Sequence, residues 1–534
     1  MSEAEVTAGQ PDVAGPGGQQ PGKRKGLRGN PRLTLLAAAV GVMMVAIDGT
    51  IVAVANPSIQ ANLGASLAGI QWVTNGYLLA LAITLITIGK IGDRFGHKRI
   101  FLAGIIGFGL TSAAIGLGGD LAHSITLMIA FRVLQGVFGA MLQPTALALL
   151  RATFPIDKLN GAIGVWGAVI GASTAAGPII GGLLVQHINW EACFYVNVPV
   201  GLIALVIGLL VLRETPVSTA ARSFDIPGIA ALTAFLFLLV WPLIKGADYG
   251  WGSARTIGFF AAAVVALALF ILRESRAPEP LLPLKLFRSV ALSAGTVLVL
   301  TLMFAMFGAM FFMTFFMENV HGLDPVATGV RLLPMTGMLI VGSPLAGTVI
   351  TRIGPRIPML VGMLAAAAAL FGLSRIGTGS SLNDTILWFA LLGLGLSPVI
   401  VGGTEVIVGN APVELAGVAA GLQSTAMQVG GTIGTAVLGA VMAGKVTSEL
   451  PARWAAAHLP ALSPSQLAGA ESLTEVGVAP VQKGIPAQVA ATITDIAHSV
   501  FVSGMTASFL VAGCVAVFGA LVALLTRKGH VVEH

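Results

Sequence analysis

The chain has 534 residues, of which 56% are hydrophobic and only 10% carry a formal charge. A water-soluble protein of this length needs more surface charge, so the composition excludes that class and indicates a polytopic membrane protein. Two cysteines exclude a disulfide framework, and the eight histidines form no cluster with metal-ligand spacing. We therefore expect neither a metal site nor a cofactor.

The N-terminal segment differs in composition from the rest of the chain. Residues 1–32 are rich in Gly, Pro and Gln and then become basic at Lys23, Arg24 and Lys25. The apolar run that follows is too long for the hydrophobic region of a signal peptide. We expect residues 1–32 to be a disordered cytoplasmic tail that precedes a retained membrane helix.

Apolar runs between charged or turn-rich breaks predict an all-α protein with fourteen transmembrane helices. At about 1.5 Å per residue, each run is long enough to cross all or most of a hydrocarbon core of about 30 Å. The predicted spans are 33–56, 70–89, 100–119, 124–149, 161–185, 194–212, 226–244, 256–272, 290–317, 326–350, 357–374, 385–409, 415–443 and 500–526.

Basic residues predict how this chain is oriented. Most Lys and Arg lie in segments that fourteen spans place on the same side as the N-terminus, so we expect both termini, including a tail at 527–534, in the cytoplasm. This asymmetry also explains the net charge of +6 without a nucleic-acid partner. Residues 444–499 are then an outer loop, in which 486–500 fits a short interfacial helix.

An internal repeat predicts the domain organisation. The segment GKIGDRFGHK (89–98) is similar to GTVITRIGPR (347–356), eight predicted spans later. Repeats of this kind are common in secondary transporters. They predict an N-terminal six-helix bundle (33–213), a two-helix insert (226–273) and a C-terminal six-helix bundle (290–526).

Asp48 is the only formal charge in the first predicted span. A carboxylate at that depth costs about 2.5–3.5 kcal/mol on insertion scales, so a compensating partner is expected. Arg132 lies at a matching depth in the fourth span, and we expect the two side chains to be neighbours. The alternative is that Arg132 extends to the outer membrane interface.

The turn between the second and third spans combines glycines with a dense cluster of charges. Positive-inside topology alone would explain its basic residues but neither the acidic residue nor the glycine spacing. The turn resembles the loop motif of the major facilitator superfamily, in which the acidic residue helps to latch the cytoplasmic side. This resemblance implies a gate formed by Gly89, Asp93, Arg94, Gly96 and Lys98.

The fifth predicted span contains Gly177, Pro178, Gly181 and Gly182. Small residues let another helix approach closely, and the proline permits a bend. A packing face with no further role is one interpretation. The pattern G-P-x-x-G-G also resembles the antiporter motif of drug exporters, although Ser173 stands where that motif usually has glycine.

The fourth span extends the resemblance, because R-x-x-Q-G at Arg132, Gln135 and Gly136 is similar to a motif of the same family that is linked to proton transfer. The chain as a whole resembles the fourteen-helix drug:proton antiporters of the major facilitator superfamily. The resemblance implies a monomeric transporter of the plasma membrane, not an enzyme, that works by alternating access.

Candidate substrate-cavity residues are Met306, Met310, Phe311, Glu405 and Gln135. The ninth span places methionines at alternating spacings of three and four beside a stripe of phenylalanines, which suits a polarisable cavity wall. Ordinary packing or lipid contact is the alternative for that span. Glu405 is either a contact for a cationic substrate or an interfacial carboxylate.

The expected function is proton-coupled export of lipophilic, cationic drugs or antibiotics, with the substrate, protons and the lipid bilayer as partners. The segment GAVMAGKV (439–446) lacks the Ser or Thr and the preceding strand of a phosphate-binding loop, so a gradient rather than ATP supplies the energy. Two alternatives remain at this point: a dedicated exporter of one endogenous metabolite, lipid or siderophore, and a membrane-embedded transferase.

Overall fold

The computed structural model describes residues 27–215, 225–278, 280–381, 383–411, 415–481 and 485–526. Most of the predicted N-terminal tail, residues 1–26, and the predicted C-terminal tail, 527–534, lie outside the described residues. Within the described ranges, fourteen helices are long and apolar enough to cross a membrane. The predicted all-α, polytopic fold is therefore confirmed.

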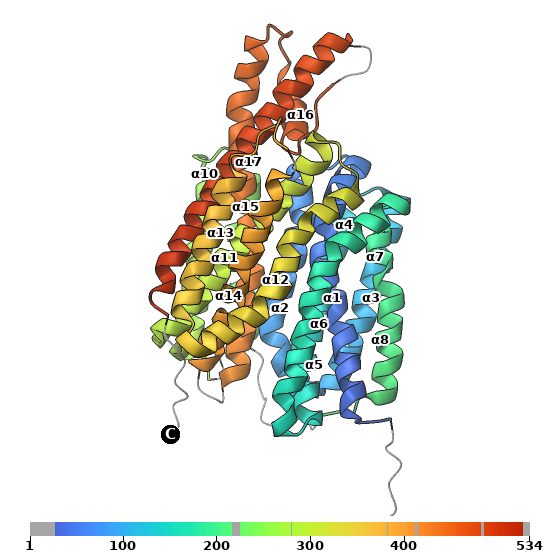
Figure 1. The fold of residues 1–534 in the computed structure, drawn as a ribbon, viewed down its shortest axis with the longest axis vertical. Coiled ribbons are helices and arrows are strands. Elements are labelled where there is room, and N and C mark those ends of the chain that lie inside the picture. The colour runs from blue at the N-terminus through green and yellow to red at the C-terminus, as the bar shows by residue number, and fades with distance from the viewer. Residues whose placement is uncertain are drawn as a thin grey trace, which may run out of the picture.

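The helices form two bundles joined by an insert (Figure 1). The N-terminal bundle consists of α1 (Pro31–Leu63), α2 (Leu67–Phe95), α3 (His97–Ala122), α4 (Ile125–Ala140), α5 (Leu142–Thr153), α6 (Ile156–His187), α7 (Ala192–Tyr195) and α8 (Asn197–Val211). The insert consists of α9 (Ile226–Tyr249) and α10 (Ala254–Arg276).

The C-terminal bundle begins with a 3-10 helix, η1 (Leu284–Arg288), and contains a π-helical turn, η2 (Phe316–Val320). Its α-helices are α11 (Val290–Phe315), α12 (Pro325–Ile353), α13 (Arg356–Leu373), α14 (Asp384–Gly409), α15 (Ala416–Ala456), α16 (Pro464–Thr474) and α17 (Ala487–Ala523). Helix α1 begins and α17 ends at the same end of the molecule, at the bottom of Figure 1.

The two bundles meet along two main helix pairs, α6 with α12 and α2 with α15. The insert is attached beside the second pair, since α9 contacts both α2 and α15. Aromatic rings make this attachment: the centroid of Trp241 lies 5.4 Å from that of Trp72 and 5.3 Å from that of Phe237. Helix α9 of the insert therefore lies along the α2–α15 contact between the bundles. It does not lie along the α6–α12 contact.

Local sequence explains where several helices begin and end. The Asn30 side chain accepts a hydrogen bond from the backbone N–H of Arg32 (3.0 Å), and Asp324 accepts one from Ala327 (2.7 Å), so each caps the first turn of its helix. Helix α1 ends at Gly64, whose left-handed backbone (φ 58°) suits glycine. These caps fix the starts of α1 and α12.

The fourth predicted span, 124–149, is divided into α4 and α5. Pro144 explains the break, because proline has no N–H to donate to the carbonyl of Ala140, and its ring crowds that carbonyl. The segment still crosses as one span, from Ile125 to Thr153.

The connection at 444–499 differs from the predicted loop. Helix α15 continues to Ala456, α16 follows, and α17 begins at Ala487 and runs unbroken into the last span instead of forming a separate interfacial helix. Ion pairs at i,i+4 spacing support the extension of α15: Glu449 lies 3.2 Å from Lys445 and 2.7 Å from Arg453. Figure 1 shows these segments projecting beyond the other helices.

Glycines set the closest helix contacts of the N-terminal bundle. A Cβ at Gly136 of α4 would lie 3.0 Å from the Cβ of Ala80 and 3.2 Å from the backbone nitrogen of Leu81, both in α2. Helices α2 and α4 pack along much of their lengths. Only a residue without a side chain fits this approach.

We predict that Gly136→Val destabilises the folded protein by about 1–3 kcal/mol, because the added side chain must push α2 away. Gly109→Val is the matched control, since a Cβ at Gly109 in α3 meets nothing within 4 Å. Thermal unfolding of both purified variants, followed by intrinsic fluorescence in detergent, measures the difference. Equal melting temperatures for the two variants would contradict the packing argument.

Candidate functional site

The Asp48 carboxylate lies in the middle of α1 and is 0% exposed. Its Oδ2 accepts a hydrogen bond from Arg132 Nη1 at 2.6 Å. Its Oδ1 accepts from Gln135 Nε2 at 3.0 Å and from Asn197 Nδ2 at 3.2 Å. The predicted contact between Asp48 and Arg132 is therefore present, and both carboxylate oxygens are bonded, as a buried charge requires.

Arg132 is buried, with a side chain that is 2% exposed, so it does not extend to the membrane interface. Its Nε donates to the Val73 carbonyl at 3.1 Å, and its Nη1 also donates to Gln135 Oε1 at 2.5 Å. The guanidinium carbon lies 4.1 Å from the centre of the Tyr77 ring. Arg132 and Gln135 are three residues apart on α4, which places both on the face toward Asp48.

Two members of the Asp48 cluster were not among the predicted site residues. Ser112 of α3 accepts hydrogen bonds from Gln135 Nε2 (2.6 Å) and Asn197 Nδ2 (3.3 Å), and Asn197 begins α8. The cluster thus joins α1, α3, α4 and α8. In the sequence, each of these two residues is visible only as a polar residue inside a predicted span. That position alone does not show toward which helix the side chain points.

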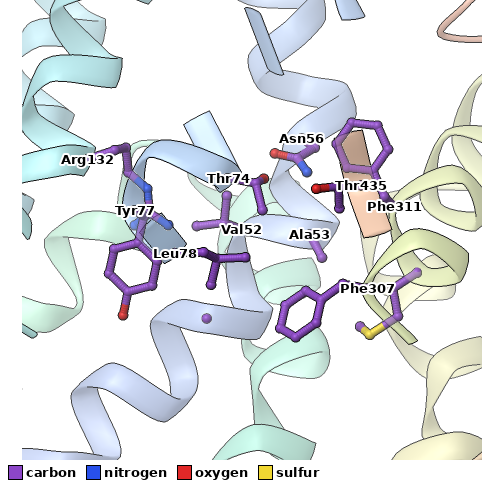
Figure 2. A pocket seen from close by; sticks show the side chains of 12 residues that line it. Val52, Ala53, Asn56, Thr74, Tyr77, Leu78, Arg132, Phe307, Phe311 and Thr435 are labelled. Atoms are coloured by element: carbon purple, nitrogen blue, oxygen red, sulfur yellow. The ribbon is translucent and has the colours of Figure 1, made fainter. Parts of the chain in front are cut away.

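A cavity lies beside this cluster and between the two bundles (Figure 2). The space in it that a water molecule can enter is about 20 Å³, so the cavity is nearly closed in this conformation. Twelve described residues from α1, α2, α4, α11 and α15 line it: Gly49, Val52, Ala53, Asn56, Thr74, Tyr77, Leu78, Arg132, Phe307, Met310, Phe311 and Thr435. Arg132 therefore borders both the Asp48 cluster and the cavity.

The structure brings only part of the predicted substrate set to this cavity. Met310 and Phe311 line it, and Phe307 joins them. Met306 is buried in α11, and Gln135 is turned toward Asp48, where its amide makes the bonds described above. Glu405 is partly buried in α14 and is not among the lining residues.

The four antiporter-motif residues form a junction of three helices. A Cβ at Gly181 of α6 would lie 2.9 Å from the Ile51 side chain of α1. A Cβ at Gly182 would lie 2.8 Å from Val326 Cα of α12, and the carbonyl of Pro178 directly faces Gly329 of α12. Gly177 likewise packs against α1, where Thr50 donates to the carbonyl of Thr174 at 3.1 Å. The motif thus links the helix of Asp48 to the C-terminal bundle.

The predicted gate lies at the turn between α2 and α3, where Gly96 has φ 96°. Arg94 stacks over the Phe95 ring at 5.5 Å, and Lys98 Nζ donates to the Leu212 carbonyl at 2.8 Å. Gly89 and Asp93 are described only as helical backbone, so the latch role of Asp93 stays a prediction.

Sequence reasoning did not identify Glu214 as part of this turn. It follows α8, and its carboxylate accepts hydrogen bonds from the backbone N–H of Lys98 (2.9 Å) and Arg99 (3.3 Å). A carboxylate at the N-terminus of α3 satisfies free N–H groups and complements the helix dipole. The end of α8 is thereby tied to the turn.

No group of three or more His, Cys, Asp or Glu side chains is placed to hold a metal ion in the part of the chain that the structure describes. The Asp48 cluster instead offers a buried carboxylate held beside a guanidinium cation. A buried ion pair between helices, beside a cavity between two bundles, is typical of transporters.

Comparison with known proteins agrees with this geometry. Residues 38–435 match the sequence model of the Major Facilitator Superfamily. The chain belongs to this superfamily. Solved transporter structures share the fold: a bacterial homologue of the human lysosomal transporter Spinster, in an inward-facing and unoccupied conformation, has a TM-score of 0.61 at 18% identity, covering 92% of this chain and 98% of that chain.

The members of the superfamily that are similar to this chain in sequence include proteins named for drug resistance. The tetracenomycin C resistance and export protein of Streptomyces glaucescens is 59% identical over 505 residues, covering 95% of this chain and 93% of that protein. The multidrug resistance protein Stp of Mycobacterium tuberculosis is 35% identical over 419 residues, covering 78% of this chain and 77% of that protein. This chain is a multi-pass membrane transporter that resembles drug exporters.

We predict that Arg132→Met destabilises the protein by about 3–5 kcal/mol, because the Asp48 charge is then buried without its cation. The double variant Asp48→Leu and Arg132→Met should recover much of that loss, since it replaces the pair with apolar side chains. Thermal unfolding of the single and double variants measures both effects. A double variant less stable than the single variant would show that the charge pair is not the cause.

Proposed function

We propose that this protein is a proton-coupled antiporter that exports a lipophilic small molecule, a drug or an antibiotic, by alternating access. The observation that carries the proposal is the fully buried Asp48–Arg132 pair, which borders the cavity between the bundles. We further propose a monomer in the plasma membrane with both termini in the cytoplasm. The superfamily consists of transporters, which favours transport over a transferase activity.

Proton binding at Asp48 provides the chemical step. The deprotonated carboxylate uses both oxygens to hold donors from α4 and α8. Protonation removes the negative charge, and the attraction that draws Arg132 toward α1 is lost. The two protonation states therefore favour different positions of α1 relative to α4 and α8, which is the differential interaction that a conformational change requires.

The energy of one proton is sufficient for export. A charge moving through about 150 mV supplies roughly 3.5 kcal/mol, at about 2.3 kcal/mol per 100 mV. Each 1.4 kcal/mol corresponds to about a tenfold ratio of concentrations. The energy of one proton therefore supports a concentration ratio of a few hundred for an uncharged solute. No nucleotide is needed for export at this level.

The α6–α12 junction is the proposed point of closure. Gly182 faces Pro325 and Val326 near the end of α6 and the start of α12, and Gly329 faces Pro178 one turn further. In the predicted topology this end faces outward. We propose that the glycines allow contact when the outer side is closed and that the bundles separate there to release substrate.

Export of a single antibiotic is a second form of this function. It is favoured by the 59% identity to the tetracenomycin C resistance and export protein, which extends over nearly the whole of both chains. The relatives named for multidrug resistance match at lower identity over less of the chain. A dedicated exporter and a multidrug exporter would share the Asp48 mechanism.

We expect Asp48→Asn to abolish proton-driven efflux, because an amide cannot alternate between charged and neutral forms. The measurement is uptake of antibiotic or dye into inverted vesicles with an imposed pH gradient, at matched protein content. Asp384→Asn is the control, since Asp384 is exposed in the first turn of α14. Undiminished gradient-driven transport by Asp48→Asn would refute the assignment of the proton site.

We expect Gly182→Val to reduce transport by about fivefold or more, because overpacking of about 1–3 kcal/mol disfavours the conformation in which α6 contacts α12. Gly171→Val is matched to it: both lie in α6, but a Cβ at Gly171 meets nothing within 4 Å. Initial rates in the same vesicles, normalised to folded protein, measure the effect. Equal rates for the two variants would exclude a role of this junction in the cycle.

A further inference from the structure

The cavity beside Arg132 contains no carboxylate among its described lining residues. Asp48 is bonded to the lining residue Arg132, but it is 0% exposed and both of its carboxylate oxygens already accept hydrogen bonds. The one ionised lining residue is the Arg132 cation. A cationic substrate would therefore find no free counter-charge here.

Three polar side chains on the cavity wall have atoms that lack a partner among the described residues; one of these atoms is the hydroxyl of Tyr77 in α2. Asn56 of α1 is 1% exposed, and its Oδ1 accepts no hydrogen bond. Thr74 of α2 is partly buried, and its Oγ1 makes no hydrogen bond. Leaving such groups unpaired costs about 1–3 kcal/mol each, so a ligand that pairs them gains this free energy.

A further polar group on the wall, Thr435, already has hydrogen-bond partners. Thr435 of α15 donates to Asn75 Oδ1 at 2.5 Å, while its backbone carbonyl accepts from Gln71 Nε2 at 2.7 Å. This pair fixes Thr435 on the wall and holds α2 against α15. The polar wall is thus built from both bundles, as a site that closes around a substrate requires.

Another part of the cavity lining is aromatic and polarisable. Phe307 and Phe311 are one turn apart on α11, Met310 lies between them in sequence, and all three line the cavity. Figure 2 shows the two rings close to Ala53, Asn56 and Thr435. Aromatic rings and a thioether suit the faces of a flat ring system.

From these walls we infer that the substrate is an uncharged, flat aromatic compound whose edge carries hydroxyl and carbonyl groups, and that it enters when the two bundles move apart around this nearly closed cavity. Its rings lie against Phe307 and Phe311, and its oxygens pair with Asn56 and Thr74. A hydroxyl supplies the donor that Asn56 Oδ1 lacks, and a carbonyl accepts from the Thr74 hydroxyl. The inference rests on the proposed export function and replaces the cationic substrate that was expected from the sequence.

The test is equilibrium binding to the purified full-length protein with three flat aromatic probes. A dihydroxyanthraquinone is flat, oxygenated and uncharged at neutral pH, anthracene is its hydrocarbon counterpart, and ethidium is a flat cation. We expect the anthraquinone to bind most tightly. Tighter binding of ethidium than of the anthraquinone would overturn the inference.

Two substitutions locate the contacts. Thr74→Val and Asn56→Leu should each weaken anthraquinone binding by up to about tenfold and leave anthracene binding unchanged, since each removes one hydrogen bond. Thr34→Val is the matched control: Thr34 Oγ1 in α1 is also buried and unpaired in the described structure, but Thr34 does not line the cavity. If Asn56→Leu does not fold, Thr74→Val, which keeps the side-chain shape, decides alone; anthraquinone affinity unchanged by Thr74→Val overturns the inference.

Vesicle transport separates this inference from the proposed function. Gradient-driven transport of ethidium but not of the anthraquinone, lost in Asp48→Asn, would refute the substrate class and leave proton-coupled export standing. Anthraquinone binding that depends on Thr74, without any transport that responds to the pH gradient, would support the substrate class and refute the antiport mechanism.

Discussion

The buried carboxylate of Asp48 is the constraint on which the N-terminal bundle depends. A charge in the interior of a membrane protein must be bonded at every available oxygen, because neither water nor lipid compensates for it. Here the donors come from Arg132 and Gln135 of α4 and from Asn197 of α8, with Ser112 of α3 bonded to the two amides. Four helices are therefore held at fixed depth and rotation around one group.

That group is physically connected to the seam between the bundles. Helix α1, which contains Asp48, packs against Gly177 and Gly181 of α6, and the next glycine of α6 packs against the start of α12. On another side, Arg132 reaches the cavity that α11 and α15 also line. A displacement of α1 or α4 thus acts on both a contact between the bundles and the wall of the cavity, without a long chain of intermediates.

The features that could be predicted from the sequence are those with a large free-energy cost in a membrane: long apolar helices and buried charges. Fourteen spans follow from hydropathy, and the pairing of Asp48 with Arg132 follows from the cost of leaving either charge alone at matching depth. Asn197 and Ser112 were missed because an uncharged polar side chain costs little free energy in a membrane helix. Such a side chain can therefore face the core or another helix, and its presence in the sequence does not show which. The direction of Gln135 depends on the rotation of α4, which its apolar residues do not determine.

Cooperative helix formation also explains the misjudged connection at 444–499. Hydropathy falls after the thirteenth span, so the segment was expected to be a loop with a short helix only at 486–500. Ion pairs of Glu449 with Lys445 and Arg453, with Ser503 of α17 donating to the same carboxylate, stabilise helix in a region that is polar without being irregular. Hydropathy therefore indicates where a helix leaves the apolar part of the membrane. Where the helix itself ends depends on local interactions such as these ion pairs.

An uncharged substrate also suits the charge balance of the proposed cycle. With Asp48 deprotonated, the pair with Arg132 is neutral overall, and the polar wall and the aromatic wall dominate the cavity. With Asp48 protonated, the guanidinium beside the cavity has lost its counter-charge, and its desolvation becomes costly unless water or another partner reaches it. Opening of the cavity to water lowers that cost, so the protonated form favours an open, hydrated cavity and the deprotonated form a closed one. Proton and substrate are then coupled through hydration of Arg132, with no need for them to compete for the same oxygen atoms.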